Sequence, residues 1–444
     1  TARLLSERAA AFAGIVAVTT DADYFVSGYD ARTMGEAGVL GLVGTDGVFR
    51  ARRSGETVSA GGGIDPDLLE QARAAGDTEP VPVRTTPWDG VRRYLVVREL
   101  FRFPVAIVVG LAWGALWANH WAVWTAYAFV QGTMFWALFC VGHDCGHQSF
   151  SPSKRINDVV GNIVHSAILV PYHPWRISHR KHHSNHGHVE NDESWHPLSK
   201  SIYDGLDGQA QIGRFKFPIP LFAYPIYLIK GVPGKEGSHF DPNNKRLFQE
   251  GEKRDVIEST VCFFGAVGAI AACVAKFGLA TVAKVYFAPY LCYILWLDAV
   301  TYLHHHGADD DERLPWYRGD EWDYLRGGLT TLDRDYGIFN HIHHDIGTHI
   351  LHHLFHGMPH YNLVEATEAV KPVFGDYYRE PPPCPGPYVT GPKGRRYSLG
   401  LPFHLWKPLV KSFKEDHWVP DQGDGPLFYQ AGGEEFGAPR AEAR

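Results

Sequence analysis

Cysteine motifs and concentrated charge are both scarce in this 444-residue sequence. The six cysteines include no Cys-x-x-Cys pair and lie mostly in or beside apolar runs. This pattern argues against a disulfide framework and against a thiolate zinc site. The formal net charge of −7 is spread along the chain rather than gathered in blocks, so we expect no nucleic-acid binding.

Two cofactor motifs are also missing. No Gly-x-Gly-x-x-Gly word follows a predicted strand, and the haem-binding word His-Pro-Gly-Gly does not occur. A redox reaction on this chain would therefore need electrons from a separate protein.

Charge is missing from two long apolar runs, at residues 103–118 and 121–141, which only Asn119 and His120 separate. A second pair follows at residues 261–274 and 282–303, with Lys276 and Lys284 near the turn. Runs of this length predict membrane-spanning helices. The predicted fold is therefore an all-α integral membrane protein with four transmembrane helices, and the alternative is a buried helical pair in a soluble core.

The number of crossings determines on which side of the membrane the polar segments lie. Each pair of crossings returns the chain to its starting side, so the histidine-rich segments after the second and fourth crossings form a cap on the same face as both termini. Basic residues on that face indicate the cytoplasmic or stromal side. They are Arg92, Arg93, Lys154, Arg155, Arg176, Arg180 and Lys181.

Outside the membrane segments we expect three further regions. Residues 1–80 form an extension of unknown role, disordered or a fragment of a sensor domain, and too short to bury a core. Within it, residues 39–50 predict strand, turn and strand, with Asp46-Gly47 as the turn. Its acidic residues Asp21, Asp23 and Asp30 argue against a plastid transit peptide. Residues 81–430 form the membrane domain, in which residues 156–171 form an amphipathic segment on the membrane, and residues 431–444 form a polar tail.

Histidine is concentrated in two segments. Of the 25 histidines, ten lie between His143 and His196 and eleven between His304 and His360. Three sets within them have helical spacing, which brings imidazoles to one face of a helix. Together they offer eight imidazoles, which are His143, His147, His179, His182, His183, His349, His352 and His353.

Eight nitrogen ligands are too many for one tetrahedral zinc ion and are enough for two ions. Imidazole suits iron, zinc or copper, so the ligand type alone does not choose the metal. No set has the His-Glu-x-x-His pattern of zinc hydrolases, which supply a general base beside their ligands. We therefore interpret the three sets as a pair of redox metals.

The sets and the words around them resemble membrane fatty acid desaturases, a family of non-haem di-iron enzymes. The similarity runs from about Val81 to about Tyr429 and is closest to plant and algal omega-3 (delta-15) members. Asp144 favours the omega-3 branch, and His196-Pro197 is more like plastid members. The words that carry the resemblance span residues 170–173, 175–179, 185–195, 325–337 and 343–349.

This resemblance implies further site residues. The family uses a ninth histidine at the end of the fourth crossing, which we assign to His305, and His344 is a further candidate ligand. Residues expected to hydrogen-bond the ligands rather than bind metal are Asp144, His173, His186, Asp192, Glu193, Asp333 and Asp345.

The resemblance also implies the reaction, in which O2 activated at two iron ions inserts a cis double bond at the omega-3 position of linoleoyl chains on membrane lipids. Electrons would come from ferredoxin in a plastid membrane, or from cytochrome b5 at the endoplasmic reticulum. Alternatives on the same scaffold are a delta-12 desaturase, a hydroxylase or an acetylenase. The alternative from a different class of protein is a histidine-rich metal transporter. Such a transporter would place its ionisable ligands inside the crossings.

Overall fold

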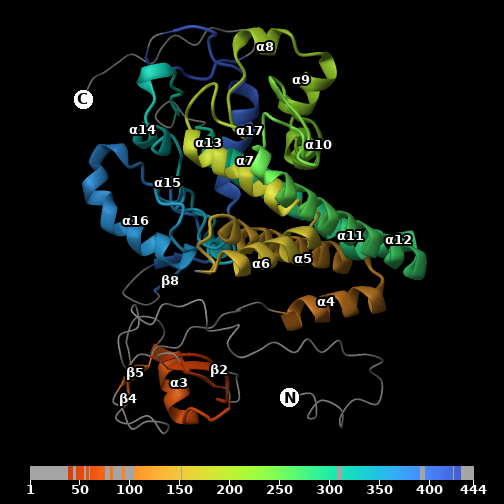
Figure 1. Ribbon diagram of the computed structural model, residues 1–444, viewed down its shortest axis with the longest axis vertical. Helices are drawn as coiled ribbons and strands as arrows, with labels where there is room; N and C mark the ends of the chain where they lie inside the picture. The colour runs from red at the N-terminus through yellow and green to blue at the C-terminus, as the bar shows by residue number, and fades with distance from the viewer. Residues whose placement is uncertain are drawn as a thin grey trace. The chain divides into compact units, whose positions relative to one another are not determined.

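The computed structural model (Figure 1) divides the chain into two compact units, Thr1–Phe103 and Pro104–Arg444. Each unit is described by itself. The residues whose structure is described are 39–43, 47–54, 57–59, 61–75, 81–83, 93–95, 105–151, 153–307, 313–390, 396–423 and 425–431.

The first unit contains a small antiparallel sheet and one helix. Strands β1 (Val39–Val43), β2 (Phe49–Ser54) and β3 (Thr57–Ser59) pair in the order β1-β2-β3. The two predicted strands are confirmed, whereas Asp46 of the predicted turn lies outside the described residues. Helix α3 (Pro66–Ala75) follows. Phe49, Ile64 and Leu69 are buried together, so the expectation that this extension buries no core was wrong. A separate two-stranded pair joins β4 (Val81–Val83) to β5 (Arg93–Leu95).

The second unit is mostly helical. Among the described residues, three helical stretches are long and apolar enough to cross a membrane. They are α5 (Trp121–Gly146), the stretch that ends with α11 (Lys253–Phe277), and the stretch from α12 (Leu279–Val282) through a π-helical segment (Ala283–Phe287) to α13 (Ala288–His305). No part of the apolar window of α11 is buried by protein, as expected of a helix that faces lipid.

The described part of the expected first crossing is residues 105–118, because residues 103 and 104 lie outside the described residues. It forms α4 (Val105–Ala118), whose 14 residues extend about 21 Å at about 1.5 Å per residue. The hydrocarbon core of a bilayer is about 30 Å thick, so this helix does not by itself span one. The expected third crossing is longer than its 14-residue apolar run, because the helix continues through the polar start of α11.

Helices α5 and α13 pack closely at a glycine of α5. A Cβ atom at Gly132 of α5 would stand 2.5 Å from the Cβ of Cys292 and 2.6 Å from the carbonyl oxygen of Pro289. Small residues allow such close approach of helices in membranes. This contact fixes the relative position of the two helices whose C-terminal ends carry His143 and His305.

Most of the remaining elements form the cap beyond the polar ends of α5, α11 and α13, whereas the helix that follows α5 lies alongside it (Figure 1). Amphipathic helix α6 (Lys154–Ala167) exposes Val159 and Ile163. The cap elements are α7 (Tyr172–Asn185), α8 (Lys200–Asp204), α9 (Gly208–Phe215), η2 (Ile219–Phe222), α10 (Tyr224–Lys230), β6 (Gly231–Val232), β7 (Lys235–Glu236), η3 (Glu250–Glu252), η5 (Gly319–Glu321), α14 (Tyr324–Gly328), η6 (Gly337–Phe339), α15 (His349–Leu354), α16 (His360–Phe374), η7 (Gly375–Tyr377), β8 (Tyr388–Thr390), β9 (Arg396–Ser398), η9 (Phe403–Leu405) and α17 (Trp406–Glu415).

Candidate metal centre

The first cluster of imidazoles joins three helices. Its members, whose ligand atoms all lie within 4.8 Å of one another, are His143, His147, His179, His183 and His352. The Nε2 atoms of His143 and His147 are 3.2 Å apart, and those of His147 and His179 are 3.0 Å apart. These atoms converge on one small volume at the end of α5, between α7 and α15.

The second cluster is centred on His305 at the end of α13. The Nε2 atom of His349 lies 3.3 Å from that of His305 and 3.1 Å from that of His353. His305 also belongs to a group with His182 and His186 whose ligand atoms lie within 4.8 Å of one another. His305 therefore connects α7 and α15 on this side of the centre.

Helices α7 and α15 each contribute imidazoles to both clusters, because their histidines are three and four residues apart. Helix α7 sends His179 and His183 to the first cluster and His182 to the second. Helix α15 sends His352 to the first cluster and His349 and His353 to the second. Residues three and four apart lie on neighbouring lines of a helix, so one turn of each helix reaches two adjacent volumes.

Burial makes these imidazoles suitable for a cation. Burial, followed by repulsion from neighbouring imidazoles, holds the pKa values of His183, His349 and His353 well below the ordinary histidine value. They therefore stay neutral and keep a lone pair for a metal. The buried Nε2 atom of His352 has no hydrogen-bond partner within the described residues, and such an atom costs free energy unless a ligand binds it.

Asp192 orients one of these ligand candidates. This fully buried carboxylate accepts hydrogen bonds from Nδ1 of His182 at 2.8 Å and Nδ1 of His186 at 3.0 Å. Burial opposes its ionisation, yet the electrostatic attraction of His182 and the hydrogen bonds from both imidazoles hold the pKa of Asp192 below its ordinary value. A proton held at Nδ1 leaves Nε2 of His182 free to bind a metal.

Asp144 lies in a different group. Its Oδ2 accepts a hydrogen bond of 2.6 Å from Nδ1 of His360, and Nδ1 of His344 is 3.8 Å away. Its Oδ1 is 3.6 Å from Nδ1 of His143 in the first cluster. His344, the further ligand candidate, therefore lies beside Asp144 and outside both larger clusters.

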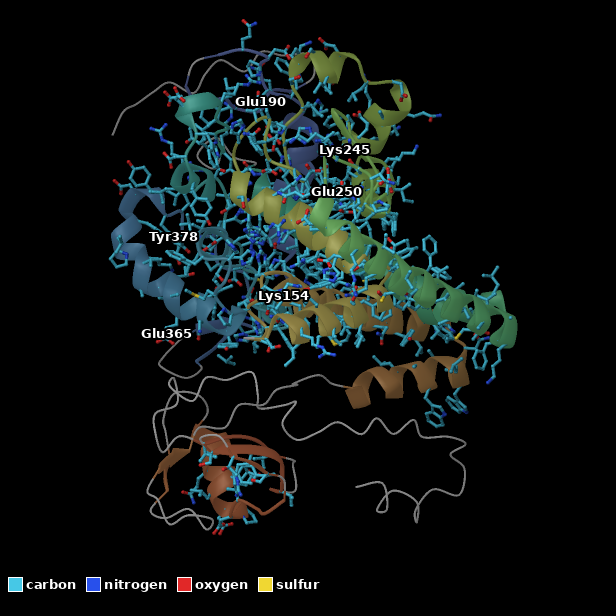
Figure 2. The ribbon with its side chains drawn as sticks, in the orientation of Figure 1. Lys154, Glu190, Lys245, Glu250, Glu365 and Tyr378 are labelled. Carbon is cyan, nitrogen blue, oxygen red and sulfur yellow. The ribbon has the colours of Figure 1, made fainter. Side chains whose placement is uncertain are left out.

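Asp333 supports the start of α15. It accepts hydrogen bonds from the backbone N–H of Ile350 at 2.9 Å and from the hydroxyl of Tyr378 at 2.8 Å. Figure 2 shows Tyr378 beside α16. Burial raises the pKa of Asp333 to about 6. Asp333 thus fixes the helix that carries His349 rather than an imidazole directly.

Three other residues that were predicted to hydrogen-bond the ligands make no hydrogen bond to a cluster imidazole within the described part of the chain. Glu193 forms an ion pair with Arg246 at 2.6 Å. Asp345 pairs with the exposed His341 at 3.0 Å. Nε2 of the buried His173 accepts a hydrogen bond of 3.3 Å from the Asn162 side chain.

Two tryptophans at the centre were not predicted. The ring of Trp175 stacks on His179 with 4.8 Å between centroids, and the ring of Trp195 stacks on His305 with 5.5 Å between centroids. Trp175 precedes His179 by four residues, so helical spacing could have indicated that contact. Trp195 and His305 are far apart in sequence, and no local pattern indicates theirs.

Comparison with known proteins agrees with this geometry. Residues 119–381 match the family model described as fatty acid desaturase. The chain is 52% identical over 393 residues to the chloroplastic omega-3 fatty acid desaturase of Sesamum indicum, covering 88% of this chain and 82% of the relative.

Two further relatives differ in compartment. The chain is 57% identical over 346 residues to the temperature-sensitive sn-2 acyl-lipid omega-3 desaturase (ferredoxin), chloroplastic, of Arabidopsis thaliana, covering 78% of this chain and 74% of the relative. It is 52% identical over 368 residues to the endoplasmic reticulum omega-3 fatty acid desaturase of Nicotiana tabacum, covering 83% of this chain and 91% of the relative.

Proposed function

Because this chain belongs to the fatty acid desaturase family, we propose that it is an acyl-lipid omega-3 desaturase, which inserts a cis double bond at the omega-3 position of linoleoyl chains in membrane lipids. The observation that carries this proposal is the pair of imidazole clusters joined by α7 and α15. They lie within a chain that is more than half identical to omega-3 desaturases over most of its length.

The centre suits two iron ions. One ion would be held by His143, His147, His179, His183 and His352, and the other by His182, His305, His349 and His353, which are the candidate ligands proposed from the two clusters. Two bound iron ions would supply the activation of O2 that hydrogen removal from an unactivated methylene needs. Support comes from the all-imidazole donor set and the unpartnered buried nitrogen of His352.

The residues of the chain itself prepare this chemistry. Burial keeps the imidazoles of His183, His349 and His353 neutral and limits the access of water to the second cluster. Asp192 holds the proton of His182 on Nδ1, and Asp144 lies within ion-pair distance of Nδ1 of His143. Asp192 would thus orient one ligand of the second cluster, and Asp144 would act on one ligand of the first cluster through its charge alone.

Four crossings complete the proposed membrane arrangement. Helix α4 packs against α5 and carries no charged residue, which supports its place as the first crossing, with the bilayer locally thinned around it. With four crossings, the imidazole clusters and both ends of the chain lie on the stromal face of a plastid membrane. The compartment and the donor, ferredoxin, are inferred from the chloroplastic relatives, and the endoplasmic reticulum with cytochrome b5 is the alternative.

The decisive experiment is expression of the full chain in yeast fed linoleate, with and without co-expressed ferredoxin and its reductase. Gas chromatography with mass spectrometry should reveal alpha-linolenate, and more of it when ferredoxin is present. A hydroxylated or acetylenic product would contradict the proposed outcome of the reaction. Equal product without ferredoxin would instead favour cytochrome b5, which yeast itself supplies.

A further inference from the structure

A small cavity lies at the end of the helices opposite to the imidazole clusters, where α4 meets α5 and α11 meets α12. Its volume is about 140 Å³. Figure 1 shows α12 at the far end of the helices from α7 and α15. The residues that line the cavity are Leu116, Asn119, Trp124, Ala280, Thr281 and Lys284.

Tryptophans around this cavity place it at the level of lipid headgroups. The exposed fractions are 71% for Trp113, 81% for Trp117 and 74% for Trp121. Exposed tryptophans are enriched at the boundary between hydrocarbon and water, where their rings sit among headgroups. The cavity therefore opens where the polar part of a lipid lies, in the leaflet away from the imidazole clusters.

The cavity holds a positive charge without a carboxylate partner. Nζ of Lys284 donates a hydrogen bond of 3.2 Å to Oδ1 of Asn119 and lies 5.3 Å from the ring centroid of Trp124. Within the described residues, Lys284 makes no ion pair. The sequence explains this, because residues 104–143 and 259–297 contain neither Asp nor Glu. Lys284 is exposed at the mouth of the cavity, and an ammonium group without an acid beside it can pair with an anion.

Other donors in the lining are also available. Nε1 of Trp124 donates to the same Oδ1 of Asn119 at 3.2 Å, and within the described residues the amide N–H groups of Asn119 make no hydrogen bond. The hydroxyl of Thr281 adds another donor to the lining. Leu116, Ala280 and the Trp124 ring provide apolar contact beside these polar groups, as an amphipathic ligand needs.

The backbone around Lys284 and Asn119 has two unusual features. Lys284 lies in the π-helical stretch Ala283–Phe287, and such stretches are rare and frequent at functional sites. The hydroxyl of Tyr127 donates 2.9 Å to the carbonyl of Val285, which ties α5 to this stretch. Asn119 adopts a left-handed backbone with φ of 44°, an uncommon conformation that places its side chain at the turn.

From this combination we propose that the cavity binds the anionic phosphate or sulfonate headgroup of a membrane lipid. Lys284 supplies the charge, Asn119 and Thr281 supply hydrogen bonds, and the lipid tails lie along the exposed apolar surface of α4 and α11. The site is distinct from the imidazole clusters, and it does not depend on the reaction that they catalyse.

The test compares lipid retention by matched variants of the full chain. Each is purified into nanodiscs of phosphatidylcholine with a minor fraction of phosphatidylglycerol, then released, and its bound lipid is measured by native mass spectrometry. Wild type and Lys276→Gln should retain phosphatidylglycerol in preference to phosphatidylcholine, because Lys276 lies near the same end over Phe277 and does not line the cavity. Lys284→Gln should lose this preference, and Lys284→Arg should keep it.

Two results would overturn the proposal. One is equal retention of phosphatidylglycerol by wild type and a folded Lys284→Gln variant. The other comes from thermal unfolding in phosphatidylcholine alone. If inorganic phosphate raised the melting temperature as much as phosphatidylglycerol does, and Lys284→Gln abolished both effects, the site would bind a soluble anion rather than a lipid.

Discussion

Asp192 is the residue through which the surrounding protein acts most directly on the second imidazole cluster. It accepts hydrogen bonds from His182 and His186, and backbone N–H groups of Ser194 and Trp195 also donate to its Oδ1 at 3.2 Å. The carboxylate therefore orients His182 and also shapes the turn that brings Trp195 onto His305. Loss of this charge should reduce the fraction of His182 that carries its proton on Nδ1. It should also loosen the local turn.

We expect Asp192→Asn to lower metal affinity at the second cluster by about 10–100-fold, the usual effect of removing a carboxylate that orients a ligand imidazole. Iron content per chain, measured by inductively coupled plasma mass spectrometry at increasing chelator concentration, tests this. Glu193→Gln is the matched control, because Glu193 pairs with Arg246 and touches no cluster imidazole. Equal chelator sensitivity of both variants would remove Asp192 from this role.

A second substitution addresses the first cluster. His352→Ala removes a buried imidazole whose Nε2 has no partner within the described residues, so we expect loss of about one iron per chain and of lipid product, since an open site of fixed geometry needs its full ligand set. His341→Ala is the control, because His341 is exposed and pairs with Asp345. Two irons retained by His352→Ala would exclude it as a ligand.

Sequence spacing predicted which histidines share a helix, and α7 and α15 confirm it. It did not predict how one helix divides its imidazoles between two clusters, because that division depends on where α5 and α13 end. Neighbouring acids show the same limit. Asp192 and Glu193 are adjacent, yet one faces imidazoles and the other faces Arg246 across 53 residues of sequence. Such long-range pairing has no local signal.

The close approach of α5 and α13 connects the two clusters mechanically. Gly132 lies where a Cβ atom would stand 2.6 Å from the backbone oxygen of Pro289, and a backbone atom cannot swing aside as a side chain can. Any widening there would separate the ends of the helices that carry His143 and His305. The membrane packing of these two helices thus sets the distance between the two halves of the centre.

Gly132→Ala should therefore destabilise the protein by about 1–3 kcal/mol, the usual cost of overpacking. Gly265→Ala is the opposite control, because nothing lies within 4 Å of a Cβ at Gly265 of α11. That change should stabilise helix α11 by about 0.5–1 kcal/mol, since alanine loses less backbone entropy than glycine. Thermal unfolding in the same nanodisc, followed by tryptophan fluorescence, should shift the two melting temperatures in opposite directions. Shifts of the same sign would contradict the inferred contact.

The first unit raises the question of whether the reaction needs it. Its sheet and α3 share their own buried residues, and the family model begins at residue 119. The match to the Sesamum indicum relative covers 88% of the chain and so includes part of residues 1–80, which corrects the expected start of the similarity near Val81. We propose that residues 1–80 form an extension that the reaction does not need. A chain that starts at residue 81 should give undiminished alpha-linolenate in the yeast assay, at matched protein amounts on immunoblots. Loss of product by a stably expressed truncation would assign this unit a role in activity.

The last prediction concerns the membrane topology of α11. If α11 crosses the membrane once, Lys245 before it and Lys276 at its end face opposite sides, and Figure 2 labels Lys245 in the cap. A membrane-impermeant maleimide added to sealed vesicles should label Lys245→Cys and Lys276→Cys from opposite sides. The unsubstituted chain is the control, because Cys262 and Cys273 lie on the apolar part of α11, where a water-soluble reagent confined outside the bilayer does not reach them. Labelling of both variants from the same side would contradict the crossing, and with it the separation of the imidazole clusters from the cavity around Lys284.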